Sequence, residues 1–117
     1  MKKVNFFLVG EPKCGTTILY HYFKNHKSLF LSDVKEPSYF CSDFFNEIES
    51  NKDSYSFRTL NDYHSLYDLK SNKKYLCDFS PGYLFSKVAA ENIYKYNKKS
   101  KILVLLREPV SFFKKFP

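Results

Sequence analysis

Residues 6–19 read Phe6-Phe7-Leu8-Val9-Gly10-Glu11-Pro12-Lys13-Cys14-Gly15-Thr16-Thr17-Ile18-Leu19. An apolar run ends at a glycine, a short loop carries a lysine, a second glycine and two hydroxyl residues, and an amphipathic helical pattern follows. This order is typical of a strand–loop–helix unit that binds phosphate, because the first backbone amides of a helix have no partners within it and attract anions. The sequence therefore predicts an anion site in this loop.

The loop differs from the usual nucleotide-binding loop in the place of its lysine. In the pattern G-x-x-x-x-G-K-[ST] the lysine directly follows the second glycine. Here Thr16 holds that position, and the lysine is Lys13, inside the loop. Lys13 would therefore meet a bound anion from another side. The alternative interpretation is an ordinary strand-to-helix turn that contains glycine.

Three further segments accompany the loop: Lys35-Glu36-Pro37-Ser38-Tyr39-Phe40, Asp78-Phe79-Ser80-Pro81-Gly82-Tyr83-Leu84, and residues 101–110, which end in Leu106-Arg107-Glu108-Pro109-Val110. Together with Pro12-Lys13-Cys14-Gly15-Thr16-Thr17 they resemble, in order, four motifs of the sulfotransferases that use 3′-phosphoadenosine 5′-phosphosulfate (PAPS). These motifs are the 5′-phosphosulfate loop, K-E-P-x-[FY]-F, [DE]-x-[ST]-P-x-Y-[LF], and the R-[DN]-P-V start of the 3′-phosphate site. The resemblance spans nearly the whole chain.

The resemblance implies a role for each matching residue. Lys13 would hold the bridging oxygen and the 5′-phosphate of the donor, and Arg107 would bind its 3′-phosphate. Glu36 would act as general base on a hydroxyl acceptor, as the corresponding glutamate does in relatives that sulfate carbohydrates. The remaining donor contacts would come from Cys14, Gly15, Thr16 and Thr17. A carbohydrate acceptor is therefore implied, and the chemistry needs no metal.

Each of these assignments has a simpler alternative. Glu36 could instead pair with Lys35 or cap a helix that begins at Pro37. Arg107 could form an ion pair at the end of its strand with Glu108 or Asp78.

The sequence also departs from the family pattern. Phe112 and Lys115 stand where the family has an arginine and a serine of the 3′-phosphate site, and Phe79 stands where several carbohydrate-modifying relatives have a lysine. Two other functions therefore stay open: a nucleotide-binding module without catalysis, such as half of a split enzyme, and a P-loop kinase or ATPase. For the last, Asp78 is the one candidate ligand of Mg²⁺.

Length and composition limit the other readings. A chain of 117 residues is one domain, residues 1–117, and members of this family are much longer, so we expect an N-terminal, truncated portion of the fold. The formal charge of +7 favours anionic partners, but no nucleic-acid-binding module is recognisable. Cys14, Cys41 and Cys77 show neither disulfide nor metal-ligand spacing. No segment is long enough to span a membrane, so we expect a cytoplasmic protein.

Hydrophobic periodicity predicts strands at residues 4–9, 29–31, 74–78 and 102–106, and helices near residues 16–25, 59–69 and 84–96. Two helix faces should be buried, one formed by Ile18, Leu19, Tyr22 and Phe23 and the other by Val88, Ala89, Ile93 and Tyr96. Alternating strands and helices predict an α/β fold with a P-loop-like parallel sheet and flanking helices. In such a sheet all four motifs follow strands, and they would meet at one edge. Exposed apolar surface on an incomplete sheet predicts self-association or a complementing chain.

Overall fold

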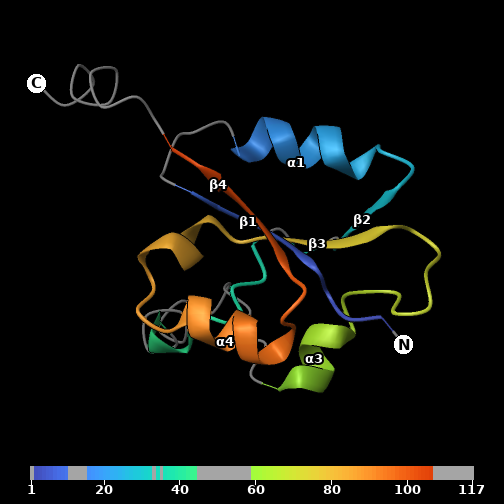
Figure 1. Ribbon diagram of the computed structural model, residues 1–117. Helices are drawn as coiled ribbons and strands as arrows, with labels where there is room; N and C mark the ends of the chain where they lie inside the picture. The colour runs from blue at the N-terminus through green and yellow to red at the C-terminus, as the bar shows by residue number, and fades with distance from the viewer. Residues whose placement is uncertain (1, 11–15, 33, 35, 45–58, 107–117) are drawn as a thin grey trace, which may run out of the picture.

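The computed structural model describes residues 2–10, 16–32, 34, 36–44 and 59–106. Its sheet has four parallel strands, β1 (Phe6–Gly10), β2 (Leu29–Leu31), β3 (Tyr75–Phe79) and β4 (Lys101–Leu105). The spatial order is β2-β3-β1-β4, so the first strand in the sequence lies inside the sheet (Figure 1). The predicted α/β fold with a parallel sheet is confirmed, and each strand lies within two residues of its predicted bounds.

Helices cover both faces of this sheet. One face carries α1 (Thr16–Lys24), and the opposite face carries α3 (Leu60–His64) and α4 (Ala89–Tyr96) (Figure 1). Two short 3₁₀ helices, η1 (Ser42–Phe44) and η2 (Pro81–Phe85), connect these elements. Thr59 begins α3 by accepting a hydrogen bond from the Asp62 amide at 3.1 Å, which satisfies one of the free amides of its first turn.

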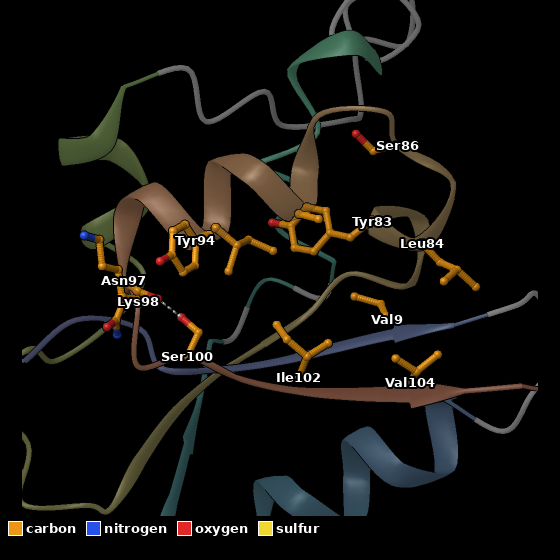
Figure 2. A pocket seen from close by; sticks show the side chains of 12 residues that line it. Val9, Tyr83, Leu84, Ser86, Tyr94, Asn97, Lys98, Ser100, Ile102 and Val104 are labelled. Carbon is orange, nitrogen blue, oxygen red and sulfur yellow. Dashed lines mark hydrogen bonds between the residues drawn. The ribbon is translucent and has the colours of Figure 1, made fainter.

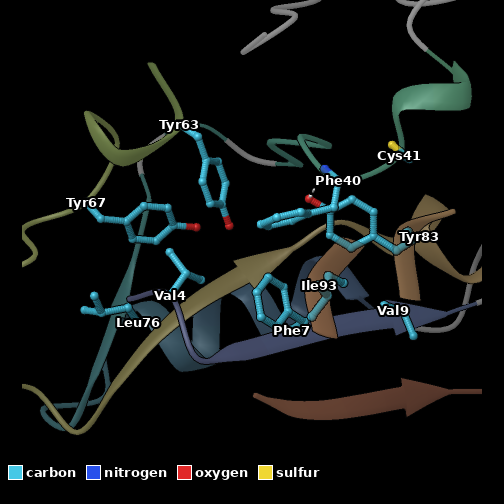
Figure 3. Packing of buried hydrophobic residues seen from close by; sticks show 11 residues of the cluster. Val4, Phe7, Val9, Phe40, Cys41, Tyr63, Tyr67, Leu76, Tyr83 and Ile93 are labelled. Carbon is cyan, nitrogen blue, oxygen red and sulfur yellow. Dashed lines mark hydrogen bonds between the residues drawn. The ribbon is translucent and has the colours of Figure 1, made fainter. Parts of the chain in front are cut away.

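The core has two halves because successive side chains of β1 point to opposite faces. Phe7 and Val9 face α3 and α4, and Leu8 faces α1. The larger half is rich in aromatic rings, with Phe40 at 5.3 Å from Tyr63 in an edge-to-face contact (Figure 3). Each such pair adds about 0.5–1.5 kcal/mol beyond the burial of its area.

The buried face of α1 differs from the predicted one. Leu19, Tyr20 and Phe23 pack on the sheet, whereas Ile18 and Tyr22 are 76% and 66% exposed. The predicted face included Ile18 and Tyr22 and left out Tyr20, which is 6% exposed. Tyr20 is buried because its hydroxyl donates to the backbone oxygen of Ser32 at 2.6 Å, so its polar atom has a partner.

The predicted helix over residues 84–96 is in fact two elements. The 3₁₀ helix η2 ends at Phe85, and the Ser86 hydroxyl oxygen then accepts hydrogen bonds from the amides of Val88 and Ala89 before α4 begins. Ala89, Ile93 and Tyr96 do contribute to the core, as expected. The helix predicted over residues 59–69 is likewise shorter, since α3 ends at His64 and turns follow.

Candidate functional site

All four strands run in the same direction, so their carboxyl ends lie at one edge of the sheet. At this edge Gly10 ends β1, α1 begins at Thr16, and Glu36 and Ser80 follow β2 and β3. Ligands of parallel α/β sheets bind at this edge. Of the predicted site residues, Lys13, Cys14, Gly15 and Arg107 lie outside the described residues, and only the helical backbone of Thr16 and Thr17 is described.

Gly10 has a packing role that the sequence did not reveal. A Cβ at this position would lie 2.7 Å from the backbone oxygen of Leu105, with which Gly10 is paired across β1 and β4. Its backbone lies outside the left-handed region. The glycine is therefore needed for the close approach of β4.

The turn that carries Glu36 is strained. Glu36 and Ser38 have positive φ angles of 58° and 56°, a conformation that costs a residue other than glycine about 1–2 kcal/mol. Glu36 is exposed and Pro37 between them is buried. Residues 36–39 are not helical, so Glu36 caps no helix at Pro37, and that alternative is wrong. Such strain persists only where surrounding contacts fix the backbone.

Those contacts start from a buried carboxylate. Asp78 at the end of β3 is 0% exposed and accepts three hydrogen bonds: from the Ser80 hydroxyl at 2.6 Å, the Tyr63 hydroxyl at 2.6 Å and the Tyr83 hydroxyl at 2.8 Å. Burial raises the pKa of Asp78, and the three hydrogen bonds oppose that effect. With both oxygens occupied by hydroxyl groups, Asp78 is not available to Mg²⁺, so the structure removes the metal ligand that the kinase or ATPase alternative needed.

Two of these hydroxyl groups also contact the turn. The Ser80 oxygen accepts a hydrogen bond from the Ser38 amide at 2.9 Å, and the Tyr83 oxygen accepts one from the Phe40 amide at 3.3 Å. The turn is thus tied to Asp78 at two points. The sequence placed Asp78 and Ser80 in one motif, and in the structure Asp78 lies in β3 while Ser80 lies between β3 and η2. Nothing in the sequence indicated the contact with Tyr63.

A second feature is an apolar cavity of about 410 Å³ between α4 and the sheet (Figure 2). Its lining includes Val9, Leu84, Ile93, Tyr94, Ile102 and Val104. It contains none of the residues predicted to act in catalysis or donor binding. Ile102 and Val104 line this cavity and are 49% and 44% exposed. Within the described sheet, β4 has a partner strand on one side.

The described cysteines are poor nucleophiles. Burial raises the pKa of the Cys41 thiol to about 11 and that of the Cys77 thiol to about 12, so both are protonated at neutral pH. Both are free thiols.

In the described part of the chain, no three His, Cys, Asp or Glu side chains gather in a way that could hold a metal ion. No helix among the described residues has both the length and the apolar character needed to cross a bilayer.

Comparisons with known proteins agree on one enzyme class. The chain is 31% identical over 106 residues to the membrane-associated sulfotransferase kil1 of Dictyostelium discoideum, and 30% identical over 69 residues to human carbohydrate sulfotransferase 15. It also superimposes on the crystal structure of a sulfotransferase from Alicyclobacillus acidocaldarius with a TM-score of 0.81 and 31% identity. No protein-family model matches the chain.

The matched regions are parts of longer proteins. The alignments cover 91% of this chain but 21% of kil1, and 59% of this chain but 12% of carbohydrate sulfotransferase 15. The structural match covers 95% of this chain and 47% of the bacterial enzyme. The chain therefore spans about half of that solved structure, about a fifth of kil1 and about an eighth of carbohydrate sulfotransferase 15.

Proposed function

Because this chain belongs to the sulfotransferase family, we propose that it carries the donor-binding part of an enzyme that transfers a sulfuryl group from PAPS to a hydroxyl acceptor, a carbohydrate. The observation that carries this proposal is the shared edge: the β1–α1 connection follows the carboxyl end of β1, and the exposed Glu36 follows that of β2, the parallel strand on the other side of β3. The carbohydrate acceptor is supported by the glutamate in this segment and by the likeness to carbohydrate sulfotransferase 15.

In the proposed reaction the Glu36 carboxylate takes the proton of the acceptor hydroxyl as its oxygen attacks sulfur. The bond between sulfur and the bridging oxygen breaks, and 3′-phosphoadenosine 5′-phosphate leaves with the electron pair. The Lys13 ammonium stabilises the charge that develops on the leaving phosphate, together with the backbone amides of Gly15, Thr16 and Thr17. Arg107 holds the 3′-phosphate, and Cys14 completes the loop around the 5′-phosphate.

Calorimetric titration with 3′-phosphoadenosine 5′-phosphate tests the donor site. We expect selective binding over ATP–Mg²⁺, weakened about tenfold to a hundredfold by Lys13→Ala or Arg107→Ala, since each removes a charged hydrogen-bond donor. Lys70→Ala is the control, because Lys70 is an exposed lysine in the loop before β3. Equal binding by all four proteins would show that the donor site lies elsewhere.

Glu36 is tested by turnover. With PAPS and a panel of amino-sugar oligosaccharides as acceptors, Glu36→Gln should lower kcat by about a hundredfold or more while donor binding is kept. Glu91→Gln is the matched control, since Glu91 is an exposed carboxylate on α4 that pairs with Lys95 at 3.0 Å. Donor binding with no transfer by the unmodified chain would instead support a nucleotide-binding module that needs a complementing chain.

A further inference from the structure

Two hydrogen-bonded connections lead from one buried carboxylate to the turn that carries Glu36. In the first, the Ser80 hydroxyl donates to Asp78 at 2.6 Å and its oxygen accepts from the Ser38 amide at 2.9 Å. In the second, the Tyr83 hydroxyl donates to Asp78 at 2.8 Å and its oxygen accepts from the Phe40 amide at 3.3 Å. Both connections end in the segment directly after Glu36.

The chemistry of a carboxylate fixes the direction of these bonds. An ionised carboxylate only accepts hydrogen bonds, so the hydroxyl hydrogens of Ser80 and Tyr83 both point at Asp78. Their oxygen lone pairs are therefore left for the backbone amides of the turn. A neutral amide side chain at position 78 would donate to one of the hydroxyl groups and leave that hydroxyl hydrogen without an acceptor. Asp78 thus sets the orientation of both groups that hold the turn.

The turn needs this support because of its backbone. Glu36 and Ser38 are both in the left-handed region, which side chains other than glycine rarely adopt. The Ser38 hydroxyl donates to the Glu36 carbonyl oxygen at 3.3 Å, and the Cys41 thiol donates to the Ser38 carbonyl oxygen at 3.2 Å. Within the described residues, no buried side-chain nitrogen or oxygen lacks a partner. The carboxylate, two hydroxyl groups and strained turn therefore form one complete network.

We infer that Asp78 is a positioning residue, which acts through Ser80 and Tyr83 to hold the Glu36 turn at the carboxyl edge of the sheet. This inference rests on the proposed function for the role of Glu36, but the restraint of the turn by these hydrogen bonds does not depend on that role. Asp78 is 0% exposed and lies beneath its hydroxyl partners, so it touches neither donor nor acceptor. Its contribution to transfer is to fix where the exposed carboxylate stands.

The test uses Ser80→Ala and Tyr83→Phe, which each remove one connection, because Asp78→Ala would leave three buried hydroxyl groups without an acceptor and could unfold the chain. Tyr63→Phe is the matched control: it also removes one hydroxyl from Asp78, at 2.6 Å, but Tyr63 makes no hydrogen bond to the turn. Amide hydrogen exchange, followed by nuclear magnetic resonance, reports directly how firmly these hydrogen bonds restrain the turn. With each variant's rates corrected for its own global stability from a urea titration, we expect exchange at Ser38 in Ser80→Ala and at Phe40 in Tyr83→Phe to accelerate about fivefold or more relative to Tyr63→Phe.

Turnover then separates this inference from the proposed function. Where the unmodified chain transfers sulfuryl groups, Ser80→Ala and Tyr83→Phe should lower kcat with little change in KM for PAPS, because Glu36 is displaced while the donor loop is untouched. Absence of transfer by the unmodified chain would count against the proposed function. Amide exchange would still decide whether Ser80 and Tyr83 restrain the turn. Unchanged exchange in both variants, or equal acceleration in Tyr63→Phe, would overturn the inference.

Discussion

Removing the Tyr63 hydroxyl should destabilise the protein more than the same change at Tyr67 or Tyr94. The side chain is 0% exposed and its hydroxyl donates to the Asp78 carboxylate at 2.6 Å. A hydrogen bond to a charged group contributes about 1.5–3 kcal/mol, and in Tyr63→Phe the carboxylate keeps its two other donors. For a domain of this size, one kcal/mol corresponds to about 4 °C in Tm, so we expect a decrease of about 6–12 °C.

Thermal unfolding followed by circular dichroism checks this value against two reference variants. Tyr67→Phe removes a bond of 2.8 Å to the neutral backbone oxygen of Cys77, worth about 0.5–1.5 kcal/mol, or about 2–6 °C. Tyr94 is 58% exposed, so Tyr94→Phe should change Tm by less than about 2 °C. The reasoning would be refuted if Tyr63→Phe unfolded at the same temperature as Tyr94→Phe, or above Tyr67→Phe.

Three further outcomes are expected. In a urea titration, Gly10→Ala should lower the free energy of unfolding by about 1–3 kcal/mol, because the added Cβ would lie 2.7 Å from the Leu105 oxygen. Gly82→Ala should lower it less, because its Cβ meets no atom within 4 Å. Burial raises the pKa of the Asp78 carboxyl group, so the folded state binds the carboxyl proton more tightly than the unfolded state does. This proton binding contributes stability that is complete below the ordinary pKa of aspartate and is lost as pH rises through the folded pKa. As pH is lowered from about 7 to about 4, the urea midpoint of the unmodified chain should therefore rise relative to that of Asp78→Asn. A constant difference between the two midpoints would contradict this sign. Ile102 and Val104 expose apolar area on β4, so the chain should self-associate as its concentration rises in sizing experiments. Ile102→Lys should weaken this self-association. A monomer at every concentration would exclude the self-association.

The sequence predicted the sheet well because its strands carry strong local signals. The apolar runs of β1 and β4 and the short β2 lie between polar or glycine-containing segments, so their existence follows from pattern alone. Parallel pairing then follows from the alternation with helices. The helices were less predictable, because their ends depend on capping contacts such as those of the Ser86 hydroxyl with the Val88 and Ala89 amides.

The sequence predicted the edge of the sheet at which Glu36 stands, but not the contacts that support it there. The alternation of motifs with strands predicts that Glu36 and Asp78 both lie at the carboxyl edge of the sheet. It does not predict that Asp78 is buried beneath hydroxyl groups, because Tyr63 comes from a helix separated from β3 by a loop. It also gave no sign of the positive φ angles at Glu36 and Ser38, since neither residue is a glycine. Long-range contacts and backbone strain are tertiary properties that a local pattern does not encode.

The central place of β1 affects how the chain is made. Its partners are β3, through pairs such as Phe6 with Cys77, and β4, through pairs such as Phe6 with Lys101. At a synthesis rate of about 5–20 residues per second, the ribosome needs about 3–13 s after completing β1 before it reaches β3. During that interval Phe6–Gly10 has neither neighbour and exposes an apolar strand to other nascent chains. Among the four strands of the described sheet, β1 thus waits longest for its partners during translation.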